Sequence, residues 1–361
     1  MTAAAKGTIS GKARMFVDDN GYADHKSAWL DEKGNIKTMK VPALIQSGSA
    51  GLASAGGERI SVYTLKGQDY TCNSAVAEPM NIRNADYPKS AANRVLFTHA
   101  LTKAGLLGTA IKAAVTLPFR DYYKPDGSLN DGFIEQTRQN FAAGGVAVVG
   151  CEAQPNIKEV QVKPEGMCAF YDWAMNDKGA MSESYDEMME YLGSVLVVDI
   201  GGSTTDLVTV KSWEEGTDKK VGLDHSMSGT EKAGVMDAKV VLEDLMKKKI
   251  QADGVPGFTG HGAKIPANVI ERALLKGEVS FAGKKWDFSQ ERALACRGVA
   301  ERINNYIFST VKMPQSYYAI VVVGGGAIVF KEHLQRLLPN AVFSDEFANA
   351  RGLLKYLIAQ G

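Results

Sequence analysis

Residues 194–210 read SVLVVDIGGSTTDLVTV. An apolar run ends on Asp199, two glycines and a Ser-Thr-Thr cluster follow, and a second apolar run begins after Asp206. Two apolar runs of strand length joined by a short, glycine-containing turn are typical of a β-hairpin. The stretch therefore predicts a hairpin whose tip carries glycine, hydroxyl and carboxylate groups.

The tip of this hairpin has the composition of a phosphate-binding turn. Gly201 and Gly202 lack side chains, so their backbone N–H groups can approach phosphate oxygens. The hydroxyl groups of Ser203 and Thr204 can donate further hydrogen bonds, and Asp199 can hold a hydrated Mg²⁺. An ordinary hairpin with a Gly-Gly turn is the alternative interpretation.

A second acidic turn near the start of the chain repeats this pattern. Residues 19–26 (DNGYADHK) and residues 199–206 (DIGGSTTD) both begin Asp-x-Gly after an apolar strand. Each turn places a charged side chain seven residues after its first Asp, Lys26 in one and Asp206 in the other. Two such hairpins facing one another would hold a polyphosphate and its metal ion from both sides. Lys26 would offer a positive charge to phosphate oxygens, with a plain surface lysine as the alternative.

The remaining chain shows a strand meander, a helix, a strand and a helix, and then the same order again. This pattern predicts an α/β chain of two similar halves. We expect strands at 15–17, 26–30, 36–41, 60–65, 68–72, 113–117, 146–150, 157–162 and 319–323, and helices at 91–104, 130–141, 169–175, 184–191, 230–249, 265–276, 288–311, 330–337 and 350–360. The expected domains are 1–190 and 191–346. We further expect residues 1–14 to be flexible, 48–57 to form a surface loop, and a closing helix in 347–361 to pack back onto the first domain.

The composition excludes several classes of protein. The 361 residues suffice for two domains, and 41 basic against 41 acidic side chains argue against a large nucleic-acid surface. The four cysteines lack metal or CxxC spacing, which indicates reduced thiols in a cytoplasmic protein, and His99 is expected to be packed in a helix. We find no apolar run of membrane-spanning length and no secretion signal. We therefore expect neither a membrane nor nucleic acid as a direct partner.

Three motifs, in this order and spacing, resemble the nucleotide-binding motifs of the actin, heat-shock chaperone and sugar kinase superfamily. Residues 19–26 are similar to the first phosphate loop of actin, and residues 199–206 to the superfamily's second phosphate loop. Residues 321–327, VVVGGGA, resemble its adenosine motif, in which glycine lets the backbone lie against the nucleoside. The absence of a Walker A motif and of GxGxxG after a strand disfavours P-loop and Rossmann folds.

Four further segments are similar to the plasmid-segregation actins of the ParM/StbA type. These are LFTHALTKAG at 96–105, VTLP at 115–118 followed by DYY at 121–123, VKPE at 162–165, and GLLKYL at 352–357. The resemblance runs from about residue 15 to the end of the chain. The extension before Met15 is longer than usual in the family. Tyr22 and Ala23 replace the small residues common in the first loop, which weakens the case for backbone contacts to phosphate there.

The resemblance implies a two-domain actin-like fold, a duplicated RNase H-like unit, with ATP or ADP and Mg²⁺ in the cleft between the domains. It implies that Glu165 orients the attacking water, that Asp199 is the second catalytic residue, and that Asp19 and Asp199 hold Mg²⁺ through water. The implied nucleotide-binding residues are Asp19, Asn20, Gly21, Lys26, Gly201, Gly202, Ser203, Thr204, Glu231, Lys232, Gly234, Gly324, Gly325, Gly326 and Ala327.

The same resemblance implies a bacterial ATPase that forms filaments and segregates plasmid DNA, with hydrolysis controlling filament stability. Its implied partners are further copies of itself and a DNA-binding adaptor protein. Fold alone does not decide function, so a non-polymerising small-molecule kinase of the same superfamily is the alternative. A peptide-binding chaperone would need a C-terminal substrate module, for which we expect no length to remain.

Overall fold

The structure is a computed structural model that describes residues 13–49, 61–74, 76, 78–255 and 264–361. The described residues form two compact units. The first holds those up to Leu117 with Asn130–Lys163 and Gln360–Gly361, and the second holds Pro118–Leu129 and Pro164–Ala359. The expectations for residues 1–14 and for the loop at 48–57 fall mostly outside the described residues.

The first unit contains a five-stranded sheet of order β3-β2-β1-β7-β9. Its strands are β1 (Arg14–Asn20), β2 (Asp24–Leu30), β3 (Ile36–Pro42), β7 (Ala110–Leu117) and β9 (Asn156–Pro164). Strand β1 pairs antiparallel with β2 and parallel with β7, while β2 pairs antiparallel with β3. The expected opening meander is therefore present.

The second unit repeats this topology in a sheet of order β12-β11-β10-β16-β17. Its strands are β10 (Ser194–Ile200), β11 (Thr205–Glu215), β12 (Asp218–Leu223), β16 (Ala319–Val323) and β17 (Ala341–Phe343), and β13 (Gly229–Glu231) adds to β11. Strand β10 pairs antiparallel with β11 and parallel with β16, and β11 pairs antiparallel with β12. The shared strand order confirms the predicted α/β fold of two similar halves.

A smaller sheet completes the first unit, in the order β4-β6-β5-β8. Its strands are β4 (Ile45–Ser47), β5 (Val62–Leu65), β6 (Gln68–Cys72) and β8 (Val146–Val148), and the helices of this unit are α1 (Ala91–Lys103) and α3 (Asp131–Ala142). His99 on α1 is buried, with Nδ1 2.8 Å from the hydroxyl of Tyr63. Burial lowers the pKa of His99 to about 3, so the imidazole is neutral and the predicted packing role is confirmed.

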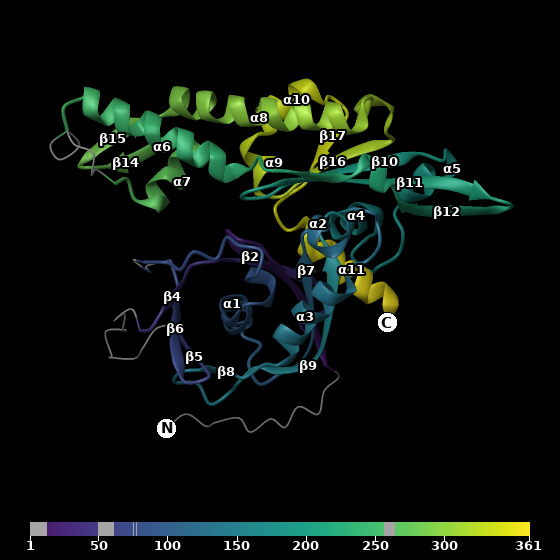
Figure 1. The fold of residues 1–361 in the computed structure, drawn as a ribbon, viewed down its shortest axis with the longest axis horizontal. Helices are drawn as coiled ribbons and strands as arrows, with labels where there is room; N and C mark the ends of the chain where they lie inside the picture. Colours follow the sequence, from purple (N-terminus) through teal and green to yellow (C-terminus); the bar gives the residue numbers. More distant parts are fainter. Residues whose placement is uncertain (1–12, 50–60, 75, 77, 256–263) are drawn as a thin grey trace. The chain divides into compact units, whose positions relative to one another are not determined.

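Helices cover both faces of the large sheet in the second unit (Figure 1). One face packs against α6 (Val235–Ala252), α8 (Ser289–Val311), α9 (Gly325–Val329) and α10 (Lys331–Leu337). The same apolar core extends to α7 (Ala267–Lys276), which packs on α6 and α8, and to the hairpin β14 (Glu278–Phe281)–β15 (Lys284–Asp287), which packs on α7. The other face packs against α2 (Phe119–Tyr122), α4 (Met167–Ala174), α5 (Glu183–Glu190) and α11 (Ala348–Gln360).

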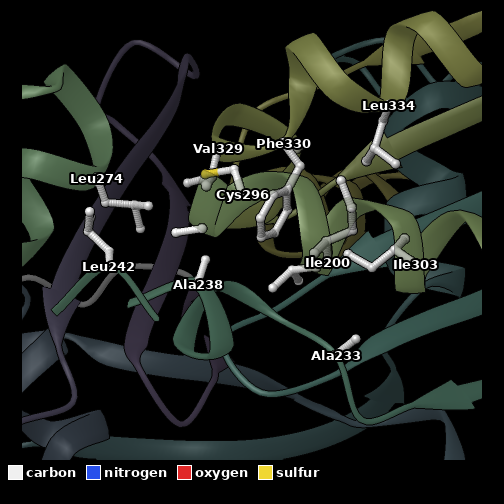
Figure 2. Packing of buried hydrophobic residues seen from close by; sticks show 14 of the residues in the cluster. Ile200, Ala233, Ala238, Leu242, Leu274, Cys296, Ile303, Val329, Phe330 and Leu334 are labelled. Carbon is white, nitrogen blue, oxygen red and sulfur yellow. The ribbon is translucent and has the colours of Figure 1, made fainter. Parts of the chain in front are cut away.

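The apolar run at the start of β10 is explained by this two-sided burial. Successive side chains of a strand point to opposite faces. Leu196, Val198 and Ile200 join the core formed with α6 and α8, and Figure 2 shows Ile200 packed among side chains of these helices. Val195 and Val197 join the core formed with α4 and α11. A strand buried on both faces reads as a continuous apolar run rather than as an alternating one.

Several elements differ from the sequence prediction. The helix expected from residue 230 begins at Val235, because residues 229–231 pair with β11 as strand β13. The hairpin β14–β15, the strands β4, β12 and β17, and the short helix α9 were not predicted. Residues 164–190, placed in the first domain by the sequence division, belong to the second compact unit, because α4 and α5 pack on β10 and β11.

The closing helix α11 packs closely against α4. A Cβ on Gly352 would lie 1.8 Å from the carbonyl oxygen of Cys168, so only glycine fits there. Arg351 and Lys355 both form ion pairs with Asp172, at 2.5 and 2.9 Å. No helix among the described residues is long and apolar enough to cross a membrane.

Candidate phosphate-binding loops

The predicted second loop is a hairpin turn between β10 and β11. Asp199 lies opposite Asp206 and Ile200 opposite Thr205. The turn is closed by a hydrogen bond of 2.8 Å from the backbone N–H of Gly201 to the carbonyl oxygen of Thr204. The two acids thus sit side by side where the strands end, with the glycine and hydroxyl residues at the tip.

The first turn of α6 packs against this loop. The backbone N–H groups of Val235 and Met236 donate to the carbonyl oxygens of Gly201 and Gly202, at 3.1 and 2.8 Å. A Cβ on Gly234 would lie 2.6 Å from the carbonyl oxygen of Gly202, so glycine is required for this approach. The positive end of the α6 dipole therefore lies beside the loop, where it favours an anion.

The glycine run after β16 packs against Asp199. In the parallel register, Asp199 pairs with Val323. Gly324 has φ +84, and a Cβ there would lie 2.5 Å from the carbonyl oxygen of Ile200 and 2.6 Å from Oδ1 of Asp199. Gly325 and Ala327 lie in α9. The predicted adenosine motif and the second loop are thus neighbours at the carboxyl ends of two parallel strands, where ligands bind in open α/β sheets.

Asn349 on α11 joins Asp199 to the turn that carries Glu165. Its Nδ2 donates to Oδ2 of Asp199 at 2.6 Å, and its Oδ1 accepts from the backbone N–H of Gly166 at 3.1 Å. Asn349 is 4% exposed, whereas Glu165 is half-buried at the end of β9. Gly166 has φ +75, and a Cβ there would lie 2.4 Å from Val208. One buried amide therefore binds both the carboxylate of Asp199 and the backbone next to Glu165.

Sequence reasoning missed Asn349. The available signal was a polar side chain within the apolar face of the closing helix, between the small residues Ala348 and Ala350. A fully buried amide needs hydrogen-bond partners, so such a position points to a polar site nearby.

Asp206 has an unusual ionisation equilibrium. It is 3% exposed, and the hydroxyl of Thr230 donates to its Oδ1. Burial raises the pKa of Asp206 to about 7, the hydrogen bond from Thr230 opposes this, and the charge of Asp199 adds to it. The acid pair thus resists carrying two full charges without a cation nearby.

Two predicted nucleotide residues, Glu231 and Lys232, lie next to the second loop but contact an arginine. Glu231 pairs with Thr205 in the sheet. Arg302 lies 3.7 Å from the carboxylate of Glu231 and donates to the carbonyl oxygen of Lys232. The structure therefore places both residues near the loop, in contact with α8.

The predicted first loop is the corresponding turn of the first unit, between β1 and β2. Asp19 lies opposite Lys26, with Nζ 3.5 Å from Oδ2. The backbone N–H of Gly21 donates to the carbonyl oxygen of Asp19 at 3.0 Å. The end of β7 fixes the loop, because Thr116 donates its hydroxyl to Asp19 at 2.8 Å and its backbone N–H to Oδ1 of Asn20 at 3.1 Å.

A buried polar network that the sequence did not reveal supports the first loop. Nδ1 of His25 lies 2.6 Å from Oδ2 of Asp18, and its Nε2 lies 2.7 Å from the hydroxyl of Tyr87. The ring of Tyr22 packs on Tyr87, with centroids 5.3 Å apart. The departure from the family pattern at Tyr22 is thus accommodated by aromatic packing within this unit.

The donor set fits a magnesium ion that is shared with phosphate groups. Within the described part of the chain, no group of three or more His, Cys, Asp or Glu side chains could hold a metal by itself. Mg²⁺ is usually held by one or two carboxylates, water molecules and substrate phosphates. Asp19 and Asp199, each at the end of a strand beside a glycine turn, have that chemistry within their own units.

Comparison with known protein families gives two matches. A family model described as plasmid segregation protein ParM, N-terminal, matches residues 13–176. A model described as archaeal actin homologue MreB-like, C-terminal, matches residues 197–336. A search of curated proteins found no match.

Solved structures share the fold over nearly the whole chain. ParM in a 15-stranded filament from Clostridium botulinum is 20% identical, over 97% of this chain and 100% of that chain, with a TM-score of 0.71. An archaeal actin homologue in complex with ADP is 19% identical, over 95% and 98%, with a TM-score of 0.69. Bacillus thuringiensis ParM in apo form is 15% identical, over 98% and 98%, with a TM-score of 0.54.

These likenesses agree with the strand order of the two units and with the motifs in residues 19–26, 199–206 and 321–327. The fold predicted from the motifs is thereby confirmed. The chain has the fold of the actin-like proteins, and its residues 13–176 are similar to the ParM N-terminal family.

Proposed function

We propose that this protein binds and hydrolyses ATP and assembles into filaments that segregate plasmid DNA. The observation that carries the proposal is the pair of equivalent acidic hairpin turns, one in each unit, of which the second is tied by Asn349 to the turn carrying Glu165. The archaeal actin homologue with the same fold was solved with ADP, which supports a nucleotide as ligand.

The two loops would bind phosphate with different groups. In the first unit, Lys26 would place its charge on phosphate oxygens, and Asn20 and Gly21 would contribute hydrogen bonds. In the second, the N–H groups and hydroxyls at Gly202, Ser203 and Thr204 would donate to phosphate, with the α6 dipole behind them. Gly201 would let the loop backbone approach the phosphate, and Asp19 and Asp199 would accept hydrogen bonds from water bound to Mg²⁺. When bound, Mg²⁺ would neutralise charge on the phosphate oxygens.

The remaining predicted residues would hold the nucleoside. Gly324 and Gly325 leave room for close approach at the end of β16, and Gly326 lies against Ile200. Ala327, Glu231, Lys232 and Gly234 complete the set of proposed nucleotide contacts.

Glu165 would orient the attacking water or accept its proton. Its turn is rigidly placed, because Gly166 donates to Asn349 and fits closely against Val208. Asp199 shares the same amide. Asn349 would thereby connect the turn that carries Glu165, the residue proposed to position water, to Asp199, the residue proposed to hold Mg²⁺.

We further propose that ATP-bound protein self-associates, that hydrolysis controls the stability of the filament, and that an adaptor protein in the cytoplasm links the filament to DNA. The Clostridium botulinum ParM with this fold is a filament, which supports self-association. The balance of 41 basic and 41 acidic side chains favours an adaptor over direct binding to nucleic acid.

The deciding experiment is light scattering and pelleting with Mg²⁺ and ATP over a range of protein concentrations, with phosphate release measured in parallel. We expect an ATP-dependent rise above a critical concentration. Absence of assembly at every concentration, with phosphate transferred to a small acceptor, would instead establish the kinase alternative.

The variant Glu165→Gln tests the catalytic assignment. It keeps the size of the side chain but removes its basicity, so we expect assembly to persist and phosphate release to slow by roughly 100-fold or more. Glu159→Gln, on the strand β9 that leads into this turn, is the matched control. Unchanged phosphate release from Glu165→Gln contradicts the assignment.

A further inference from the structure

A cavity lies in the second unit, where α8 meets α10 and the end of α9. Its volume is about 200 Å³. None of the residues proposed above to contact nucleotide lines it. The cavity is therefore a candidate site separate from the phosphate loops.

The lining of this cavity is strongly basic. Arg292, Arg297 and Arg336 line it together with one acidic side chain, Glu332. Three guanidinium groups against one carboxylate leave a net charge of +2. Such a concentration of positive charge attracts an anion and holds it more strongly than bulk solvent does.

The guanidinium groups are available for a ligand. Nε of Arg292 donates to the carbonyl oxygen of Leu274 at 2.6 Å, which fixes the direction of its fork. Neither Arg297 nor Arg336 forms an ion pair with another residue in the described part of the chain. Both residues line the cavity and are exposed.

The pKa of His333 is sensitive to the charges that line the cavity. Burial lowers the pKa of its imidazole, the charge of Glu332 raises it, and the charges of Arg297, Arg336 and Arg292 lower it. The neutral ring can donate or accept one hydrogen bond at each nitrogen, depending on its tautomer. An anion bound among the arginines would counteract their effect on this side chain.

We propose that this cavity binds an oxyanion of the phosphate class, either free phosphate or a phosphate monoester. Guanidinium groups bind phosphate oxygens bidentately, and a dianion matches the net charge of the lining. The cavity is smaller than the ~300–1,000 Å³ typical of sites for drug-sized ligands. A water molecule occupies about 30 Å³, so a tetrahedral oxyanion with some of its hydration fits.

The test is an NMR titration of the histidine C2–H signals of the full chain, in saturating ADP and Mg²⁺, with His333→Gln to assign the signal. The probe is inorganic phosphate, compared with sodium chloride at the same ionic strength. We expect phosphate, and not chloride, to raise the pKa of His333 by about one pH unit. Arg297→Ala combined with Arg336→Ala removes this rise, whereas Arg272→Ala, an exposed arginine on α7, preserves it.

A parallel titration with glycerol phosphate separates the two sources. A response to both probes indicates a monoester site, and a response to inorganic phosphate alone indicates a site for the free ion. If the pKa of His333 responds equally to phosphate and chloride, or to neither probe, the proposal is wrong. ADP affinity of the same variants is measured by calorimetric titration, which distinguishes a failure of this proposal from a failure of the proposed nucleotide function.

Discussion

Two carboxylates that face one another across the second hairpin have different surroundings. Asp199 accepts a hydrogen bond from Asn349, and Asp206 accepts one from Thr230 while being almost completely buried. Their positions at the strand ends were predictable from the apolar runs and the glycine turn. Their partners were not, because Thr230 and Asn349 are distant in sequence and reach the acids only through tertiary packing.

The raised pKa of Asp206 predicts a pH dependence of stability. In the unfolded chain this carboxyl loses its proton near pH 3.9, but in the folded protein it does so at about 7. Between these values the folded state binds more protons, so the contribution of Asp206 to stability falls as pH rises and is constant above about pH 7. Asp206→Asn does not titrate. As pH rises from 4 to 8, the free energy of unfolding of the wild type should fall by on the order of a few kcal/mol relative to that of Asp206→Asn.

Urea denaturation at several pH values measures this difference. Asp218→Asn, at an exposed acid on β12 of the same sheet, is the control and should follow wild type. Parallel pH profiles of wild type and Asp206→Asn would show that Asp206 is ionised in the folded protein over this range.

The glycine run after β16 allows steric and ligand effects to be separated. Gly324→Ala meets the carbonyl oxygen of Ile200 at 2.5 Å in a left-handed conformation, so we expect it to lose roughly 1–3 kcal/mol of stability. A Cβ on Gly325 meets nothing within 4 Å. Gly325→Ala should therefore keep the stability of wild type and weaken ADP binding only.

Calorimetric titration with ADP and thermal unfolding of both variants provide the measurement. Full ADP affinity in a stable Gly325→Ala variant would place the nucleoside away from this backbone.

At the scale of elements, the closing helix α11 holds the proposed catalytic turn in place. Asn349 bonds to Asp199 and Gly166, Gly352 lies against α4, and Lys355 pairs with Asp172. These residues recur every three positions, so they share one face of the helix. The last helix of the chain is thus part of the site's support.

Asn349→Ala leaves the carboxylate of Asp199 and the N–H of Gly166 without this partner. Loss of a buried hydrogen-bond partner costs roughly 1–3 kcal/mol, and we expect a further loss in phosphate release because both catalytic turns loosen. Gln360→Ala, exposed at the end of the same helix, is the control. Chemical denaturation and single-turnover phosphate release measure the two effects, and a purely structural role predicts lower stability with an unchanged rate in the folded fraction.

Local sequence predicted the strands and helices that have strong periodicity or clear ends. Strand β16 was predicted at its observed bounds, and α8 to within one residue. The start of α6 was placed five residues early, because residues 229–231 are held as a strand by pairing with β11. The hairpin β14–β15 and the edge strands β12 and β17 escaped prediction, because short strands depend on partners that are remote in sequence.

At the scale of the whole molecule, the two units carry one loop each on equivalent hairpins, and the proposed ligand should stabilise the folded chain. A ligand present at one hundred times its Kd adds about 2.7 kcal/mol to the unfolding free energy. We expect Mg²⁺ with ADP to raise the Tm accordingly. Lys26→Met should reduce this rise, and Lys37→Met, on exposed β3 of the same sheet, should retain it.

Differential scanning fluorimetry at matched nucleotide concentration makes the comparison. An equal rise in Tm for Lys26→Met and wild type would remove Lys26 from the phosphate site.

The burial of β10 on both faces also affects how the register of this strand against its neighbours is established during folding. A shift of one residue along a strand exchanges its two faces, yet both faces of β10 meet cores of valine, leucine and isoleucine. Apolar patterning therefore does little to oppose such a shift. The turn of the hairpin, where Asp199 faces Asp206 and Gly201 bonds to Thr204, instead fixes the register between β10 and β11. The residues proposed to act on ATP would thus also determine the strand register of the sheet.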